Sequence, residues 1–376
     1  MELQDGAPNP KEAGARDWSA LRVLLIGARL SADSMESHVL DALNVLGCTS
    51  AYASTALWID ALGFVGNSLL YKAKHTLFRE PERLTEQRLV KQAEGFQPDL
   101  ILVLQGNHLS PKTVTLLRRR LKCPIVCWCQ DHVGTLGRQY MLGAGYDAVF
   151  LKDRYMQELF SNTVKGTQFV YLPEACNPRV HRPLELTLED RRRYGCDVMI
   201  YGSLYYYRQT ILSRLDQFDL KMWSTAPAWL VNRLEKSSAG SAIVLDDKVR
   251  AVRAARIALN PLHYGEINSL NCRAFELAGC GAFQLITSKP VLSEHFTPGV
   301  ELDAFRSVDE LIEKIHHYLR HPEQAVEMAR MGQIRAHREH TYEIRLRDLF
   351  RVALNNSALV SSDGPLGATA ARASRP

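Results

Sequence analysis

The segment PDLILVLQGNHLSPKTVTLLRRRLKCPIVCWCQD, residues 98–131, contains a complete strand–helix–strand unit. Its two ends, 98–106 and 123–131, are short and almost continuously apolar, which is typical of strands buried on both faces of a parallel sheet. Between them, Ser110 and Pro111 have the sequence of a helix N-cap followed by proline in the first turn. The unit therefore predicts a parallel sheet whose strands are connected by helices.

The same alternation extends to both sides of this unit. LRVLLIG (21–27), YDAVFLKD (146–153) and QFVYLPEA (168–175) are further apolar strands, and apolar residues at helical spacing predict a helix from Ser34 to Leu46. We therefore expect a Rossmann-like N-terminal domain over residues 19–175. The polar segments at 1–18 and 356–376 have no periodicity and are expected to be disordered.

Residues 176–194 interrupt the alternation with two prolines and many charges, and they predict a linker. The alternation then resumes over 195–340, which predicts a second Rossmann-like domain and an α/β protein with two domains facing each other across a cleft. The expected elements are strands at 196–203, 221–224, 242–245, 256–261 and 282–287, and helices near 206–218, 268–279, 308–320 and 322–339. Open parallel sheets bind ligands at the carboxyl ends of their strands, so the site is expected in this cleft.

The composition fits a globular enzyme. The chain is 46% hydrophobic and 23% charged, with a net charge of +5, which argues against a disordered protein and gives little support for nucleic-acid binding. The apolar runs are too short to span a bilayer, and we expect a cytoplasmic protein. Eight scattered cysteines form no CxxC pair. Cys127 and Cys129 share one face of a predicted strand and are expected to be small buried residues.

Three glycine-containing turns are candidates for contact with an anionic ligand. Gly27 ends the first strand, although a plain strand-to-helix turn explains it equally well. Gly202 and Ser203 end the strand 196–203, and Arg208 follows in the first turn of the next helix. A backbone turn, a hydroxyl and a cation at this point suit a diphosphate, whereas a surface arginine is the alternative for Arg208.

The third candidate is NSLNCRAFELAGCGAFQLIT, residues 268–287. Asn268, Asn271 and Arg273 lie near the start of its predicted helix, where an anion is favoured. Glu276 follows three residues after Arg273, and its carboxylate can accept hydrogen bonds from two vicinal hydroxyls, as on a ribose. An Arg–Glu pair on a helix surface is the alternative.

Asp131 and His132 follow the strand that ends the opening segment, so they are expected at the cleft, where either can act as a general base. A capping aspartate with an incidental histidine is the alternative. The sequence has no DxD motif, the nearest pair being Asp246 and Asp247. We therefore expect no metal and no cofactor, with the charge of a diphosphate met by arginines and helix N-termini.

Resemblance to a known family adds to these observations. The pieces DVMIYGS, RIALNP, NSLNCRAFELAGCGAFQLIT and HREHTYEIRLRDL resemble the CgeB-type spore-maturation glycosyltransferase-like family, which is similar to retaining family-4-like transferases of GT-B fold. The resemblance implies a GT-B fold, a diphosphate loop at Gly202, Ser203 and Arg208, and a ribose contact from Glu276. It also implies that residues 341–355 form a helix that returns to the first domain. Related enzymes often carry a glutamate eight residues before the ribose-binding one, and in this sequence that position is Asn268.

These observations predict a glycosyltransferase that moves a sugar from a nucleotide diphosphate sugar to an acceptor hydroxyl in bacterial surface glycan or glycoprotein synthesis. The acceptor is a glycan, a lipid-linked glycan or a protein, no nucleic-acid partner is expected, and peripheral membrane association stays open. Two alternatives remain: a catalytically degenerate binding or scaffold protein with this fold, favoured by Asn268, and a nucleotide-sugar epimerase.

Overall fold

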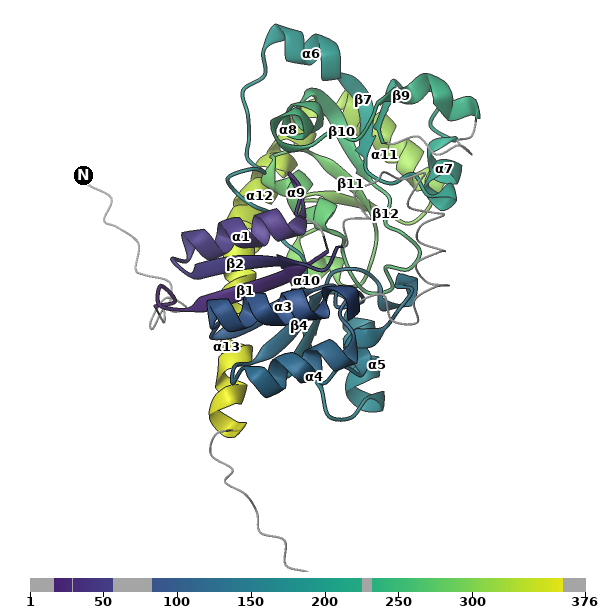
Figure 1. The fold of residues 1–376 in the computed structure, drawn as a ribbon. Helices are drawn as coiled ribbons and strands as arrows, with labels where there is room; N and C mark the ends of the chain where they lie inside the picture. Colours follow the sequence, from purple (N-terminus) through teal and green to yellow (C-terminus); the bar gives the residue numbers. More distant parts are fainter. Residues whose placement is uncertain (1–16, 29, 57–82, 225–231, 361–376) are drawn as a thin grey trace, which may run out of the picture.

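The computed structural model describes residues 17–28, 30–56, 83–224 and 232–360, and all structural statements below refer to these residues. The described residues form two six-stranded sheets, in which every pair of neighbouring strands is parallel. Figure 1 shows the two sheets as separate layers, each covered by helices. The predicted α/β class with two Rossmann-like domains is confirmed.

The first sheet has the order β2-β1-β3-β4-β5-β6. Its strands are β1 (Arg22–Gly27), β2 (Thr49–Ser54), β3 (Leu100–Leu104), β4 (Ile125–Cys129), β5 (Ala148–Leu151) and β6 (Gln168–Tyr171). The connecting helices are α1 (Met35–Val45), α3 (Arg83–Phe96), α4 (Pro111–Arg120) and α5 (Arg154–Thr163). Ser110 caps α4 as the sequence predicts, because its hydroxyl accepts a hydrogen bond from the Thr113 N–H.

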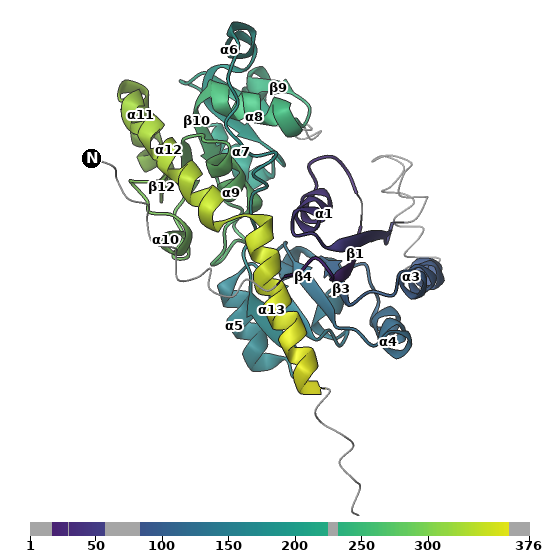
Figure 2. The ribbon, with the colours of Figure 1, turned by 90° about the vertical axis from the view of Figure 1, so that its left-hand side faces the viewer.

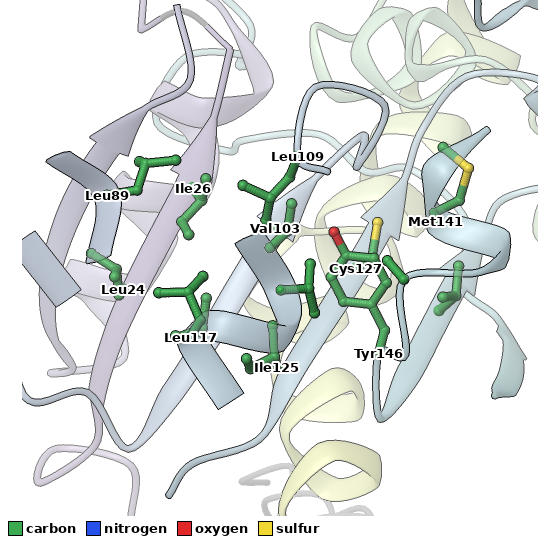
Figure 3. Packing of buried hydrophobic residues seen from close by; sticks show 14 of the residues in the cluster. Leu24, Ile26, Leu89, Val103, Leu109, Leu117, Ile125, Cys127, Met141 and Tyr146 are labelled. Carbon is green, nitrogen blue, oxygen red and sulfur yellow. The ribbon is translucent and has the colours of Figure 1, made fainter. Parts of the chain in front are cut away.

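Alternate side chains of each central strand enter two different cores. On β1, Leu24 and Ile26 pack beneath α3 and α4, whereas Val23 and Leu25 pack on the other face with α1. Figure 3 shows the first of these cores, including Cys127. Cys127 and Cys129 lie in this core with no exposed surface, which confirms that they are buried on one face.

The second sheet has the order β12-β11-β10-β7-β8-β9. Its strands are β7 (Cys196–Tyr201), β8 (Leu220–Trp223), β9 (Ser238–Gly240), β10 (Ala255–Asn260), β11 (Gln284–Thr287) and β12 (Asp303–Phe305). The helices after β6 are α6 (Leu188–Tyr194), α7 (Tyr206–Leu212), α8 (Leu245–Ala254), α9 (Cys272–Gly279), α10 (Leu292–His295), α11 (Val308–Arg320) and α12 (Pro322–Glu339). None of the described helices is long and apolar enough to cross a membrane.

The last helix, α13 (Tyr342–Val360), connects the second domain to the first. It continues the chain from α12 and then lies along the first sheet, beside α1 (Figure 2). Leu346, Leu349 and Phe350 are fully buried in the core shared with β1 and β3. The helix therefore completes the first domain from the far end of the chain, and it extends beyond the expected end at 355.

One element was predicted wrongly. Residues 242–245 (AIVL) were expected to form a strand, but the strand of this region is β9, and Leu245 begins α8. The acidic pair Asp246 and Asp247 occupies the first turn of this helix, where the helix dipole favours negative charge. The predicted linker contains α6, capped by Thr187 and Asp190 in a capping box. Of the tails expected to be disordered at 1–18 and 356–376, residues 1–16 and 361–376 lie outside the described residues. The prediction was wrong for the described remainder, because Trp18 is buried and residues 356–360 belong to α13.

The two sheets direct their carboxyl ends at each other. Asp33, in the loop after β1, forms an ion pair with Lys248 of the second domain at 2.8 Å. Lys152, directly after β5, pairs with Glu266, in the loop after β10, also at 2.8 Å. The loops that follow strands of both sheets therefore meet at one boundary, which is where the sequence predicts the site.

Candidate functional site: two buried arginines at the domain boundary

Arg208 and Arg273 of the second domain hydrogen-bond to consecutive residues, Pro261 and Asn260, and are 5% and 7% exposed. Arg208 donates to the backbone oxygens of Pro261 at 3.0 Å and Ser203 at 2.7 Å. Arg273 makes one long hydrogen bond to Asn260, at 3.4 Å, and its buried Nε has no partner among the described residues. No described carboxylate pairs with either guanidinium. Burial and the charge of Arg273 lower the pKa of Arg208 to about 9.

The charges of the two guanidinium groups are not balanced by any described carboxylate. A buried charge is ordinarily paired, because removing it from water costs several kcal/mol. Here two like charges share one buried region, and each additional cation disfavours the other. An anion with several acceptor oxygens would balance these two charges. The alternative interpretation, in which Arg208 is a surface arginine, is wrong, because Arg208 is buried.

Gly202 makes room for this pair. Its φ is +92°, a left-handed conformation, and a Cβ at this position would overlap the Nη2 atom of Arg273. Its own N–H donates to the Trp223 carbonyl, so it extends the sheet and does not face a ligand. The neighbouring Ser203 side chain is exposed. Gly202 therefore serves the site by letting a guanidinium approach the strand end, while Ser203 is free to contact a ligand.

Asn271 holds the helix that carries Arg273. Its side-chain oxygen caps α9 by accepting from the Ala274 N–H, and it also accepts from the amide of Asn260 at 3.0 Å. The Asn271 amide donates back to Asn260 at 3.1 Å. Asn260 ends β10, so this reciprocal pair fixes the start of α9 against the sheet. Asn271 thus positions Arg273, and its side chain is already engaged.

Glu276 lies one turn further along α9, and it is 7% exposed. Its Oε2 accepts from the Tyr201 hydroxyl at 2.6 Å and from Lys248 at 3.2 Å. Its Oε1 has His181 at 3.8 Å and no hydrogen bond among the described residues. Burial raises the pKa of this carboxyl, but the charges of Lys248 and His181 outweigh it and lower the pKa to about 2. Glu276 is therefore an anion with one oxygen available.

Lys248 links Glu276 to the first domain. Its ammonium lies 3.2 Å from Glu276 and 2.8 Å from Asp33, which follows β1. The Leu245 N–H also donates to Asp33 at 3.2 Å. Asp33 and Leu245 both have positive φ, +63° and +52°, a conformation that costs an ordinary residue about 1–2 kcal/mol. Contact between the domains therefore holds two unfavourable backbone conformations, one on each side.

Asp33, His38 and His181 offer three ligand atoms within 4.8 Å of one another, the spacing of a metal site. The Lys248 ammonium, however, lies 3.0 Å from His181 Nε2 as well as close to Asp33. The Lys248 ammonium thus lies beside these potential metal-ligating atoms. We assign this cluster to the contact between the domains.

Asn268 lies at the same boundary but is occupied by structural hydrogen bonds. Its N–H donates to Asp153, its carbonyl accepts from the Arg154 N–H, and its side-chain oxygen accepts from the Val291 N–H at 3.0 Å. Asp153 and Arg154 begin α5 of the first domain. Asn268 therefore anchors the loop after β10 to the first domain.

Glu266, two residues earlier, belongs to a second buried cluster. One of its oxygens accepts from Lys152 at 2.8 Å and the other from the Ser269 hydroxyl. Glu174 lies 3.8 Å from the same lysine, and one of its oxygens has no hydrogen-bond partner among the described residues. Burial, opposed by Lys152 and reinforced by Glu266, raises the pKa of Glu174 to about 8. This cluster contains two carboxyl groups and one ammonium.

Asp131 and His132 lie on the first-domain side of the boundary. Asp131 is exposed and accepts a hydrogen bond from the Gln105 amide. His132 Nδ1 accepts from the Gly134 N–H at 3.2 Å, which places the proton of a neutral ring on Nε2. That Nε2 has no partner among the described residues. A Cβ on Gly265 would lie 3.6 Å from the His132 ring, so His132 faces the loop that carries Glu266.

Gly27 ends β1, and a Cβ there would lie 2.7 Å from the Glu36 side chain of α1. This glycine therefore allows close packing of α1 against the strand end, near the loop that carries Asp33. The predicted residues thus lie around one boundary. Arg208, Arg273 and Glu276 are on the second domain, and Asp131 and His132 are on the first.

The sequence did not single out Lys248, His181, Lys152 or Glu174. Lys248 was missed because 242–245 was read as a strand, although Asp246 and Asp247 are a signal for the start of a helix. Such a helix places Lys248 in its first turns. His181 comes from the predicted linker, which has no periodicity. Lys152 and Glu174 close the predicted strands 146–153 and 168–175, but the structure ends those strands at Leu151 and Tyr171 and places both residues in the loops that follow.

Comparison with known sequences gives a match, in the second half of the chain. Residues 182–351 match the model of a family described as glycosyl transferase-like. None of the curated proteins matches the chain.

Comparison with solved structures establishes the fold. Sucrose-phosphate synthase from Thermosynechococcus elongatus is 12% identical, with a TM-score of 0.65, 91% of this chain and 100% of that chain being covered. HepE from Anabaena, in complex with UDP and glucose, is 13% identical with a TM-score of 0.59 and the same coverage. A protein of Listeria monocytogenes described as a UDP-N-acetylglucosamine 2-epimerase is 12% identical with a TM-score of 0.56, covering 91% and 98%. The chain adopts the GT-B fold.

Replacing Gly202 with alanine tests the geometry of the arginine pair. We expect G202A to lower the free energy of unfolding by about 1–2 kcal/mol, because the left-handed backbone is unfavourable for alanine and the new Cβ displaces Arg273. Urea denaturation measures this. G143A is the matched control, since Gly143 has a φ of −131° and open space at its Cβ. Equal losses in the two variants would contradict the proposed role of Gly202.

The raised pKa of Glu174 predicts a pH dependence. The folded protein retains this proton up to about pH 8, whereas an unfolded glutamate loses it near 4.5. The contribution to stability is therefore present below pH 4.5 and is lost as the pH rises toward 8, with a slope of at most about 1.4 kcal/mol per pH unit. We expect E174Q to lack this loss, so the stability of the wild type relative to E174Q falls between pH 5 and 8.5. Parallel denaturation profiles for the two proteins would contradict the assignment.

Proposed function

We propose that this protein is a glycosyltransferase that uses a nucleotide diphosphate sugar as donor. The observation that carries the proposal is the buried pair Arg208 and Arg273, which has no carboxylate partner among the described residues. A diphosphate supplies two adjacent charged groups with several acceptor oxygens, which matches two guanidinium groups side by side. The family match over 182–351 and the GT-B fold support the same class of reaction.

The arginine pair also has a chemical role in this proposal. When the bond between the sugar and the diphosphate breaks, negative charge accumulates on the departing diphosphate. Cations already in place stabilise that charge without reorganisation, and removing one preorganised donor of this kind costs roughly 3–4 kcal/mol. The guanidinium pair thus supplies the stabilisation that a divalent cation supplies elsewhere, so we propose a metal-independent reaction.

Glu276 is proposed to hold the ribose. Its carboxylate stays ionised and has one oxygen without a hydrogen bond among the described residues. Arg273 lies on the same helix, one turn earlier, so a nucleotide can contact both residues through adjacent groups. Lys248 positions Glu276 and at the same time contacts Asp33 of the first domain. Donor binding is therefore proposed to be coupled to closure of the domains.

Asp131 and His132 are proposed to act on the acceptor side. Asp131 is exposed and carries a carboxylate, so it is the candidate to take the proton of the attacking hydroxyl. His132 has its Nδ1 engaged by Gly134, so its free Nε2 carries the proton and is suited to donate to a substrate oxygen. This division refines the sequence-based hypothesis, in which either residue was a candidate base. The acceptor is proposed to belong to a surface glycan or glycoprotein, on the resemblance of the sequence alone.

Calorimetric titration with UDP tests the donor site, with GDP, ADP and dTDP as further ligands. We expect R208Q and R273Q each to weaken binding of the preferred nucleotide about 100-fold or more, which corresponds to about 2.7 kcal/mol. R306Q, an exposed arginine of the same domain, is the control and is expected to bind like the wild type. Unchanged affinity in R208Q and R273Q would refute the proposed site.

Asp131 is tested through the reaction itself. We expect D131N to bind the donor nucleotide within about threefold of the wild type but to transfer sugar about 10²- to 10⁴-fold more slowly, because a general base contributes a factor of that size. Radiolabelled donor and product separation measure both rates. A transfer rate equal to that of the wild type would exclude Asp131 as the base.

A binding or scaffold protein is the second candidate function. Asn268 favours it, because an amide stands where related enzymes carry a glutamate and its atoms are engaged in contacts with Asp153, Arg154 and Val291. The same assay separates the candidates. Nucleotide binding without transfer or hydrolysis of any donor supports the binding protein. Conversion of the donor to an epimer without acceptor supports an epimerase.

A further inference from the structure

A cavity of about 440 Å³ lies in the second domain, away from the domain boundary. Its wall includes the start of β10 at Ala255 and Arg256, and the residues Gly281–Phe283 that precede β11. Asn260, which holds Arg273 at the candidate site, is at the other end of β10, about 16 Å away at 3.3 Å per residue. The cavity therefore opens at the amino ends of the strands, opposite the edge that carries the arginine pair.

The floor of this cavity is apolar. Phe283, Ala325 and Ala329 contribute to it, together with Pro183 from the segment before α6. Tyr318 also lines it, and its hydroxyl donates to Asp303 at 2.8 Å, so that group is already satisfied. Val326 lines the same space and is 68% exposed. A volume of this size with an apolar floor is in the range of small-molecule sites, which are about 300–1,000 Å³.

The polar part of the lining is strongly cationic. Four arginines line the cavity, and no aspartate or glutamate does: the arginines are Arg191, Arg253, Arg256 and Arg330. Arg330 forms a close ion pair with Glu327. Arg256 has only Asp197, at 4.0 Å, and neither Arg191 nor Arg253 has a carboxylate partner among the described residues.

Arg253 is the arginine that most clearly indicates a ligand. Its Nη1 donates to the Gly281 carbonyl at 2.8 Å, which fixes the guanidinium at the cavity wall. Its Nε is buried and has no hydrogen-bond partner among the described residues. A cation fixed beside an apolar floor, with an unused donor, is suited to an acidic group attached to an apolar body.

We propose that this cavity is a second binding site, for an anionic amphiphile: a molecule with one phosphate or carboxylate head and an apolar tail or ring. The arginines at the rim hold the head, and the floor around Phe283 and Ala329 covers the tail. The site is separate from the proposed donor site and does not depend on glycosyl transfer. Its ligand is either a free metabolite of this chemistry or an anionic lipid in a bilayer.

Hexyl phosphate is the probe, because it combines a phosphate head and an apolar tail in one soluble molecule. Calorimetric titration of the full chain compares it with inorganic phosphate, which has only the head, and with 1-hexanol, which has only the tail. We expect hexyl phosphate to bind at least about tenfold more tightly than inorganic phosphate, since burial of two methylene groups is sufficient for that factor. Affinity equal to that of inorganic phosphate would overturn the proposal.

Variants locate the binding. R191Q/R256Q removes two exposed rim charges and V326D adds a negative one, all at exposed positions that leave the fold intact. Each is expected to weaken hexyl phosphate binding about tenfold. R347Q, an exposed arginine of α13, is the control and is expected to bind like the wild type. Binding that survives in both rim variants, or that R208Q removes instead, would overturn the proposal.

Vesicles distinguish the two sources of ligand. Phosphatidylcholine vesicles with and without phosphatidic acid are sedimented with wild-type and R191Q/R256Q protein. Sedimentation of the wild type alone, and only with phosphatidic acid, identifies a membrane lipid as the ligand. No sedimentation, with hexyl phosphate binding retained, identifies a soluble ligand. Equal sedimentation of both proteins with phosphatidic acid, or failure of both ligands to bind, would contradict the assigned site.

Discussion

The repulsion between Arg208 and Arg273 is the constraint on which the rest of the site depends. Two buried guanidinium groups without a carboxylate are unfavourable, so the surrounding chain has to hold them in place. Backbone oxygens bind Arg208, the reciprocal amide pair of Asn260 and Asn271 fixes the helix of Arg273, and Gly202 leaves room for its Nη2. These features hold the two guanidinium groups in an arrangement that an anion would complete.

The buried lysines at the domain boundary differ from the two arginines because they have carboxylate partners. Lys248 pairs with Glu276 of its own domain and Asp33 of the other, and Lys152 of the first domain pairs with Glu266 of the second. Each lysine also has a carboxylate of its own domain nearby, Glu276 for Lys248 and Glu174 for Lys152, so domain contact adds a second carboxylate to each cluster. The buried lysines thus have carboxylate partners, whereas the two arginines have none among the described residues. A dianionic ligand would neutralise the arginines, while the lysine pairs hold the domains together around it.

Much of the fold could be predicted because buried parallel strands leave a strong signal. Runs such as 100–104 and 125–129 are apolar throughout, and glycine and proline mark the turns between elements. The prediction of a strand at 242–245 was wrong, because a run of four apolar residues does not distinguish a strand from the start of a helix. Arg208 and Arg273 could be predicted as site residues from the sequence, since each follows the end of a predicted strand. Their lack of carboxylate partners could not be predicted, because it depends on which side chains three separate segments bring together.

The central claim is that a diphosphate occupies the space between Arg208 and Arg273. A crystal structure of the protein with UDP, or with whichever nucleoside diphosphate binds best, tests it most directly. The account predicts diphosphate oxygens within hydrogen-bond distance of both guanidinium groups and a ribose hydroxyl on the free oxygen of Glu276. A nucleotide bound elsewhere, with no ligand at the two arginines, would contradict it.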